Sequence, residues 1–162
     1  MIITVPQNVL KDGGSDWTFD TANFQLTEEN INEQSMKLAN TYSEWSYVAA
    51  RIRKNLLDLE RAYSDWEAKA LAIVEAEAKQ VGILFKSEKA KVTAMYNHKA
   101  ADGTNDFAEH ILFYENQKTE LQYYMDLVDN AVLKSLSVMK DMVVTVGANI
   151  RAGLNAQTNA VM

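Results

Sequence analysis

The chain of 162 residues has no cysteine and only one proline, Pro6. Without cysteine it has neither a disulfide framework nor a thiolate metal site, which suits an intracellular protein. Because proline breaks helix interiors, its absence after Pro6 permits very long helices. No apolar run reaches the length of about 18 residues that a membrane helix needs, so we expect no membrane partner. The first ten residues also lack the pattern of a secretory signal.

Motifs for catalysis are missing as well. The two histidines, His98 and His110, form no Glu-x-x-His pair of the kind that builds di-metal centres in helical bundles, and we expect both on the surface. Gly13-Gly14 lacks the Lys-Ser/Thr of a phosphate-binding loop, and no serine or threonine lies in a nucleophile-elbow context. We therefore predict that the chain is not an enzyme and needs no cofactor or metal.

What the chain does have is a long apolar seam. Apolar or aromatic residues recur at alternating steps of three and four, over five heptads, at Leu38, Tyr42, Trp45, Ala49, Ile52, Leu56, Leu59, Tyr63, Trp66, Ala70 and Ile73. This spacing is typical of a coiled coil. We expect this helix to begin after Thr27 as N-cap, with Glu28 and Glu29 in its first turn, and to extend to about Gln80.

A second long helix is predicted after the turn at residues 101–105. Asp106 and Glu109 resemble a capping box, and the helix is expected to end near Gly153. Its seam takes one extra step of four at Val128–Val132–Leu136, which is a stutter. A shorter helix is expected over residues 85–96. The sequence thus predicts an all-α fold built as a long coiled-coil helical hairpin.

The ends of the chain are expected to differ from this hairpin. Residues 1–26 are predicted to form a short irregular N-terminal arm, with a turn at residues 11–16. The aromatic residues of the arm should dock on a helix, because such side chains are rarely left in water; they are Trp17, Phe19 and Phe24. Residues 27–154 are then expected to form one helical domain, and residues 155–162 a disordered tail.

The final helix is apolar on more sides than one partner helix requires. Val143, Val144 and Val146, for example, face different directions. We therefore expect it to assemble copies of the chain into a homo-oligomer through its seam, which consists of Leu121, Met125, Val128, Val132, Leu136, Met139, Val143, Val146 and Ile150. The alternative is a closed monomeric bundle that uses a third helix from residues 83–99.

Charge is segregated along the chain, although the formal net charge is −6. Residues 51–99 carry ten basic and seven acidic side chains, while both flanking segments are acidic. Repeated cations of this kind suit phosphate binding; the candidates for single-stranded DNA are Arg51, Arg53, Lys54, Arg61, Lys69, Lys79, Lys86, Lys89, Lys91 and Lys99. Tyr47, Tyr63 and Tyr96 could stack on bases, although Tyr63 lies on the seam. Intrahelical ion pairs are the alternative explanation.

Several segments resemble a known family in order and spacing. They are Tyr42-Ser43-Glu44-Trp45, Ile52-Arg53-Lys54, Leu57-Asp58-Leu59-Glu60 and Lys86-Ser87-Glu88 through Val92, followed in the final helix by Tyr124, Leu127, Val128, Asp129, Lys140, Ile150, Arg151 and Ala152. Together they cover most of residues 40–154. In these features the chain is similar to the UvsY family of recombination mediators of T-even-type bacteriophages.

The resemblance implies a non-enzymatic mediator of DNA recombination. Proteins of this family are all-helical ring-like homo-oligomers that assemble through the C-terminal helix in the host cytoplasm. They bind single-stranded DNA, contact a RecA-like recombinase and the phage single-strand-binding protein, and help load the recombinase onto the coated strand. The other function that the sequence allows is a helical structural or adaptor protein, such as a virion assembly component, without DNA binding.

The chain departs from the family at one DNA-contacting motif. The resemblance places a Lys-x-Arg pair late in the first long helix, where this chain has Ala68 and Ala70 on either side of Lys69. Either the DNA contact has moved to Arg51, Arg53, Lys54 and the lysines of residues 86–99, or binding is weaker. The N-terminal arm is also longer than the family pattern.

Overall fold

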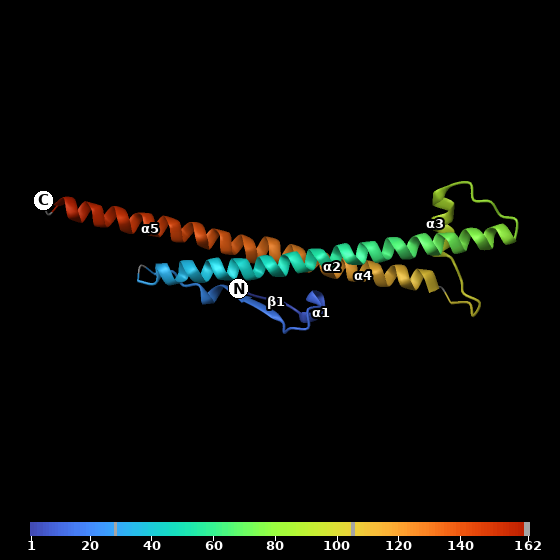
Figure 1. Cartoon of the computed structure of the whole chain (residues 1–162), viewed down its shortest axis with the longest axis horizontal. Coiled ribbons are helices and arrows are strands. Elements are labelled where there is room, and N and C mark those ends of the chain that lie inside the picture. Colours follow the sequence, from blue (N-terminus) through green and yellow to red (C-terminus); the bar gives the residue numbers. More distant parts are fainter. Residues whose placement is uncertain (28, 105, 161–162) are drawn as a thin grey trace. The chain divides into compact units, whose positions relative to one another are not determined.

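A computed structural model of the chain describes residues 1–27, 29–104 and 106–160. It is mostly helical, which confirms the predicted all-α class, with a small sheet near the start (Figure 1). The elements are β1 (Ile2–Val5), α1 (Gln7–Leu10), β2 (Trp17–Asp20), the 3-10 helix η1 (Thr21–Asn23), α2 (Ile31–Gln80), α3 (Glu88–Tyr96), α4 (Asp106–Leu127), the π-helix η2 (Val128–Leu133) and α5 (Lys134–Ala160).

The chain divides into two compact units. Unit 1 comprises Met1–Arg53 and Tyr123–Met162, and unit 2 comprises Lys54–Gln122. Helices α2 and α4 each contribute residues to both units. Residues 27–154, predicted as one domain, are therefore shared between two groups of contacts.

The prediction of an irregular N-terminal arm is wrong, because the arm forms an antiparallel β-hairpin in unit 1. Strand β1 pairs with β2 in a register that sets Ile2 opposite Asp20 and Val5 opposite Trp17. Alternate residues of the hairpin face inward, so that Ile3, Val5 and Phe19 are buried. Ile2, Ile3 and Val5 suit a short extended segment, but β1 is too short for its two-residue period to predict the pairing with β2.

Aromatic side chains dock this hairpin on α2, as the sequence predicts. The rings of Trp17 and Phe19 meet Trp45 edge-on, with centroids 6.0 and 5.9 Å apart. Phe24 lies 6.0 Å from Phe19, and the Lys37 ammonium lies 5.2 Å from the Phe24 ring. The edge-to-face geometry adds to the gain from burying the rings.

A second contact joins the arm to α2 through Arg51. Its Nε donates a hydrogen bond to the carbonyl of Leu10 at 3.2 Å, and its Nη2 donates one to the carbonyl of Lys11 at 3.3 Å. Lys11 ends α1 in the left-handed conformation, with φ of 54°. The guanidinium thus serves carbonyl groups at the C-terminal end of a short helix, where such groups lack helical partners.

Helix α2 begins later than predicted, at Ile31 rather than directly after Thr27. Asn30 organises this boundary, since its Oδ1 accepts a hydrogen bond from the Thr27 N–H at 2.8 Å and its carbonyl accepts one from the Gln34 N–H at 2.9 Å. The predicted cap at Thr27 is therefore wrong. Glu28 lies outside the described residues.

In unit 1 the first part of α2 lies antiparallel to η2 and α5. Three contacts set the direction: Ile31 lies beside Gly147, Leu38 beside Leu136, and Arg53 beside Asp129. The residues at the centre of this pairing are fully buried; they are Val48, Ile52, Val128, Val132 and Leu136. This is the helical hairpin that the two seams predict.

The predicted stutter coincides with the π-helix η2. The extra four-residue step falls at Val128, Val132 and Leu136, and η2 spans Val128–Leu133. A π-helix holds more residues per turn than an α-helix. It therefore accommodates two successive steps of four and leaves all three side chains buried.

The last helix extends further than predicted. Helix α5 continues to Ala160, past the expected end near Gly153, so residues 155–160 of the predicted disordered tail are helical. Residues 161–162 lie outside the described part of the chain. None of the described helices combines the length and the apolarity needed to cross a bilayer.

Unit 2 contains the rest of α2 together with α3 and most of α4. Its core cluster consists of Ala70, Val74, Met95, Phe107 and Ile111, with Met95 brought in by α3. The ring of Tyr63 stacks on Tyr114 at 3.8 Å, which confirms Tyr63 as a packing residue. Helix α3 begins at Glu88 with Ser87 as its N-cap, and α4 begins at the predicted Asp106.

We expect Arg51→Ala to loosen the arm. The substitution removes two charge-assisted hydrogen bonds to α1 and should lower the free energy of unfolding by about 1–3 kcal/mol. Hydrogen exchange should speed up at the amides of residues 1–24 first. Arg61→Ala is the matched control, since Arg61 is exposed and its loss should change stability by less than about 0.5 kcal/mol. Equal effects of the two variants would contradict the anchoring role.

Candidate nucleic-acid interface

The ten cations proposed for DNA binding are divided between the two units. Arg51 and Arg53 belong to unit 1, and the other eight belong to unit 2. Four of the ten are engaged within the chain. The side chains of the remaining six make no hydrogen bond or ion pair within the described residues. The sequence alone could not show which of the ten cations are engaged.

Arg51 and Arg53, the two DNA-binding candidates of unit 1, hold the fold together. Arg51 is bound to the end of α1, as described above. The Nη2 of Arg53 donates to both carboxylate oxygens of Asp129, at 2.7 and 2.6 Å. Asp129 lies in η2, so this ion pair ties the π-helix to α2. A phosphate would have to compete with these partners for either guanidinium.

Two lysines of unit 2 are also engaged. Lys54 pairs with Asp58 one turn further along α2. Lys91 of α3 bridges Glu75 of α2 at 2.5 Å and Glu88 at 2.8 Å. The hydrogen bond to Glu75 is the main reason that the pKa of Lys91 rises to about 12, and the same bond lowers the pKa of Glu75. Lys91 thus links α3 to α2.

The six remaining cations are exposed, and their side chains make no hydrogen bond or ion pair within the described residues. They are Arg61, Lys69, Lys79, Lys86, Lys89 and Lys99, which we call the unit 2 cations. Arg61 and Lys79 lie eighteen residues apart, which is about five turns and about 27 Å along one side of α2. Lys69 lies between them, about 80° around the helix. The three on α2 can therefore contact one extended polyanion.

Aromatic side chains near these cations are only partly available for stacking on bases. Tyr96, at the end of α3, is 44% exposed. Tyr63 is packed against Tyr114, and burial raises its pKa to about 12. Tyr47 is exposed but belongs to unit 1, where its ring lies 6.5 Å from Trp17. Tyr96 is the one candidate of the three that combines exposure with a place in unit 2.

The two alanines at the Lys-x-Arg positions of the resembling family have different environments. Ala68 is exposed, whereas Ala70 is 1% exposed and belongs to the core cluster of unit 2. A cationic side chain at Ala70 would have to enter this hydrophobic core. The packing of α2 therefore disfavours a cation at position 70.

The prediction that His98 lies on the surface is wrong, because its side chain bridges three segments of unit 2. Its side chain is 11% exposed and stacks on Phe107 at 4.0 Å. Its Nδ1 lies 2.9 Å from Asp106 of α4, and its Nε2 lies 3.0 Å from Glu77 of α2. The bond to Asp106 is the main cause of a raised pKa for His98. His98 lies 8 residues from Asp106 and 21 from Glu77 in the sequence, so no sequence pattern predicts these contacts. His110 is exposed, as predicted.

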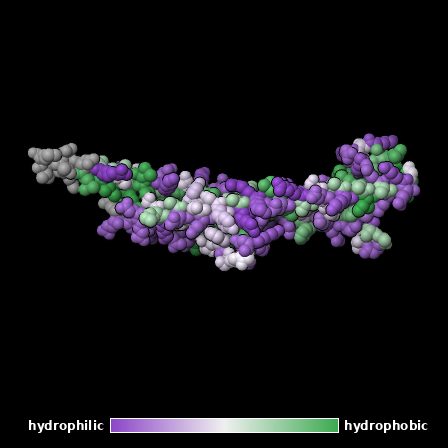
Figure 2. Space-filling view, viewed as in Figure 1, coloured by the Kyte–Doolittle hydropathy of each residue, from purple (hydrophilic) through white to green (hydrophobic). Residues whose placement is uncertain are grey.

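The seam proposed for assembly is largely covered within one chain. Five of its nine residues are buried in the described structure, namely Leu121, Val128, Val132, Leu136 and Val143. Other apolar residues of α5 are open to solvent, among them Val138 at 52%, Met142 at 53% and Val144 at 61%. Figure 2 shows hydrophobic atoms gathered along α5. A partner copy would therefore meet these exposed residues first.

Comparisons with known proteins add no family to this picture. No protein-family model matches the chain, and no curated protein or solved structure matches it either. Within the described residues, no group of three or more His, Cys, Asp or Glu side chains is arranged to hold a metal ion.

The different environments of Ala68 and Ala70 lead to a paired prediction. Ala70→Arg should destabilise the chain by about 3 kcal/mol or more, because it overpacks the core and buries a charge. Ala68→Arg should change the free energy of unfolding by less than about 0.5 kcal/mol, as is usual on a surface. Urea unfolding followed by circular dichroism measures both. Equal tolerance of the two substitutions would show that Ala70 is not part of a tight core.

The position of His98 predicts a pH-dependent stability. Because its pKa is raised in the folded chain, its contribution is fully present below its unfolded pKa of about 6.5 and is lost as the pH rises through the folded value. The thermal midpoint of the wild type should therefore fall between pH 5.5 and pH 8.5 by more than that of His98→Gln. His110→Gln retains His98 and should behave as the wild type. An unchanged pH dependence in His98→Gln would refute the bridge.

Proposed function

We propose that the protein is a recombination mediator that binds single-stranded DNA. In this role it helps load a RecA-like recombinase onto strand coated with single-strand-binding protein. The resemblance of residues 40–154 to the UvsY family motivates the recombination role. The observation that carries the DNA-binding part is the set of exposed unit 2 cations whose side chains make no hydrogen bond or ion pair among the described residues.

The charge distribution explains how a protein with a negative net charge could still bind DNA through these cations. The chain as a whole carries a formal charge of −6, so long-range attraction to DNA is weak. Local contacts from cations to phosphates release counterions and still favour binding at low salt. Several copies of a modest patch in one assembly would multiply this affinity without any new contact. The proposed homo-oligomer therefore matters for function as well as for architecture.

The mediator role requires more than binding a strand. The protein has to bind single-stranded DNA in a form that the recombinase prefers, because only a difference in affinity between two states can shift the competition. The three unit 2 cations on α2 favour an extended strand, since a straight helix spaces them over about 27 Å. An extended strand, held at its phosphates, leaves its bases open to a second protein.

DNA binding is tested by fluorescence anisotropy with a labelled oligo(dT) over a salt series. Each phosphate contact on a single strand contributes about 0.7 to the slope of log affinity against log salt. Replacing Arg61, Lys69 and Lys79 by alanine should therefore lower that slope by about 2 and weaken binding throughout. Ala68→Arg should strengthen binding, since it adds a cation beside Lys69.

The control for this experiment is Lys134→Ala, which removes an exposed cation from α5 in unit 1. It should leave both the affinity and the slope close to the wild-type values. Absence of binding by the wild type even at low salt would refute the proposal. A loss in Lys134→Ala of about a third of that in the triple variant would show that only net charge matters, since it removes one cation instead of three.

A helical adaptor or virion assembly protein without DNA binding is the second candidate. The exposed apolar residues of α5 favour it, because such surfaces mark protein contacts and require no nucleic acid. The two candidates share self-association and differ in whether oligonucleotide binds. The anisotropy experiment therefore separates them.

Self-association is expected to use the exposed side of α5. Val138→Asp combined with Met142→Asp places two carboxylates on that side and should lower the native mass in light scattering, because burying an unpaired carboxylate is costly. Both residues are exposed in the single chain, so the variant should still fold by circular dichroism. An unchanged mass would exclude this side as the assembly surface.

A further inference from the structure

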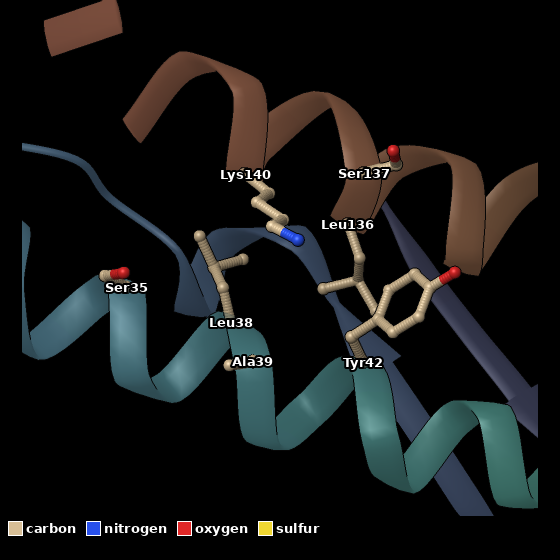
Figure 3. A pocket seen from close by; sticks show the side chains of 7 residues that line it. All are labelled: Ser35, Leu38, Ala39, Tyr42, Leu136, Ser137 and Lys140. Carbon is tan, nitrogen blue, oxygen red and sulfur yellow. The ribbon is translucent and has the colours of Figure 1, made fainter. Parts of the chain in front are cut away.

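A groove made of two hollows lies between α2 and α5 in unit 1. It consists of two adjoining hollows, of about 350 and 520 Å³, that share Ser35. The first is shown in Figure 3, where Lys140 reaches from α5 towards the space between Leu38 and Leu136. The second continues along α5 and ends at Arg151. Lys140 and Arg151 are not among the ten cations proposed for DNA binding.

The groove has an apolar floor and rims of small side chains. Leu38, Leu136 and Val143 form the floor and are buried. Small residues line both sides, with Ser35 and Ala39 on α2 and Ser137 and Gly147 on α5. Small side chains let a further helix approach closely and place its own apolar ridge between the two helices.

The charges of the groove are all of one sign. Lys140 and Arg151 line it, and no carboxylate is among the described residues that do so. The two cations lie eleven residues apart on α5, which places them on the same side about 16 Å from each other. Lys140 makes no ion pair within the described chain, and Arg151 donates only to the carbonyl of Gly147 at 3.3 Å. Both charges remain available to a ligand.

We propose that this groove binds an acidic amphipathic helix of a partner protein. Its apolar side would cover Tyr42 and Val144, the exposed large apolar side chains of the lining, above the buried floor, in the manner of helix-in-groove recognition. Carboxylates eleven residues apart on the partner share one side of their helix and match the spacing of Lys140 and Arg151. This inference is independent of DNA binding by unit 2, because it uses other residues.

The lining favours such a helix over nucleic acid. A single strand binds through stacked bases as well as phosphates, and Tyr42 is the one aromatic side chain among the lining residues of the two hollows. The floor between the two cations is aliphatic, which suits leucine or isoleucine side chains. The complementary charge of an acidic helix also suits the all-cationic groove.

The test uses designed, end-capped and fluorescein-labelled peptides of about 22 residues, long enough to form helix. One carries leucines along one side and two glutamates eleven residues apart; its partner carries lysines in place of the glutamates. Anisotropy of the full chain should show binding of the glutamate peptide and at least tenfold weaker binding of the lysine peptide. Lys140→Glu combined with Arg151→Glu should weaken the glutamate peptide by about tenfold or more.

The matched control for Lys140→Glu alone is Lys134→Glu, which makes the same charge change at one position of α5 outside the groove. It should bind the glutamate peptide as the wild type does. A second groove variant, Ala39→Glu, introduces a carboxylate at an exposed position and should also weaken binding. Circular dichroism checks that all variants fold.

Three results would overturn the proposal. One is the absence of glutamate-peptide binding by the wild type, and another is equal loss in the groove variants and in Lys134→Glu. The third is that labelled oligo(dT), or a second copy of the chain measured by native mass, loses its binding in the groove variants while the glutamate peptide does not. That result would assign the groove to nucleic acid or to self-association.

Discussion

The burial of the α2 seam is the constraint on which the rest of the structure depends. A helix from Ile31 to Gln80 with an apolar side along most of its length is not stable alone in water. The chain covers that side with two different sets of partners. In unit 1 they are η2, α5 and the aromatic residues of the N-terminal hairpin, and in unit 2 they are α3 and α4. Each set leaves different residues exposed.

This division decides which charges remain for a ligand. In unit 1 the packing of the arm and of the π-helix recruits Arg51 and Arg53. In unit 2 the short helix α3 is joined to α2 through Lys91 and Glu75, and the segment after it through His98 and Glu77. These contacts fix the backbone that carries Lys89 and Lys99 while leaving their side chains exposed. The proposed DNA-binding face would thus be held by neighbouring ion pairs of the same unit.

Helix α5 combines packing with two further surfaces. One side covers α2, a second exposes Val138 and Met142, and a third forms a groove with α2 that carries Lys140 and Arg151. The broad apolarity read from the sequence therefore reflects several surfaces of one helix. Five of the nine seam residues are buried within the chain, so the proposed assembly and the proposed partner binding would use the remaining sides of α5.

Periodicity in the sequence determined the helices, because an apolar residue every three or four positions can be buried only on one side of a helix. It located α2, the start of α4 at Asp106 and the irregularity that became η2. It missed the β-hairpin, because strands of four residues carry too little of a two-residue period. Tertiary structure alone decided the roles of Arg51, Arg53 and His98. Their partners lie between 8 and 76 residues away in the chain, and a charge on a helix surface looks the same in sequence whether it meets a carbonyl, a carboxylate or water.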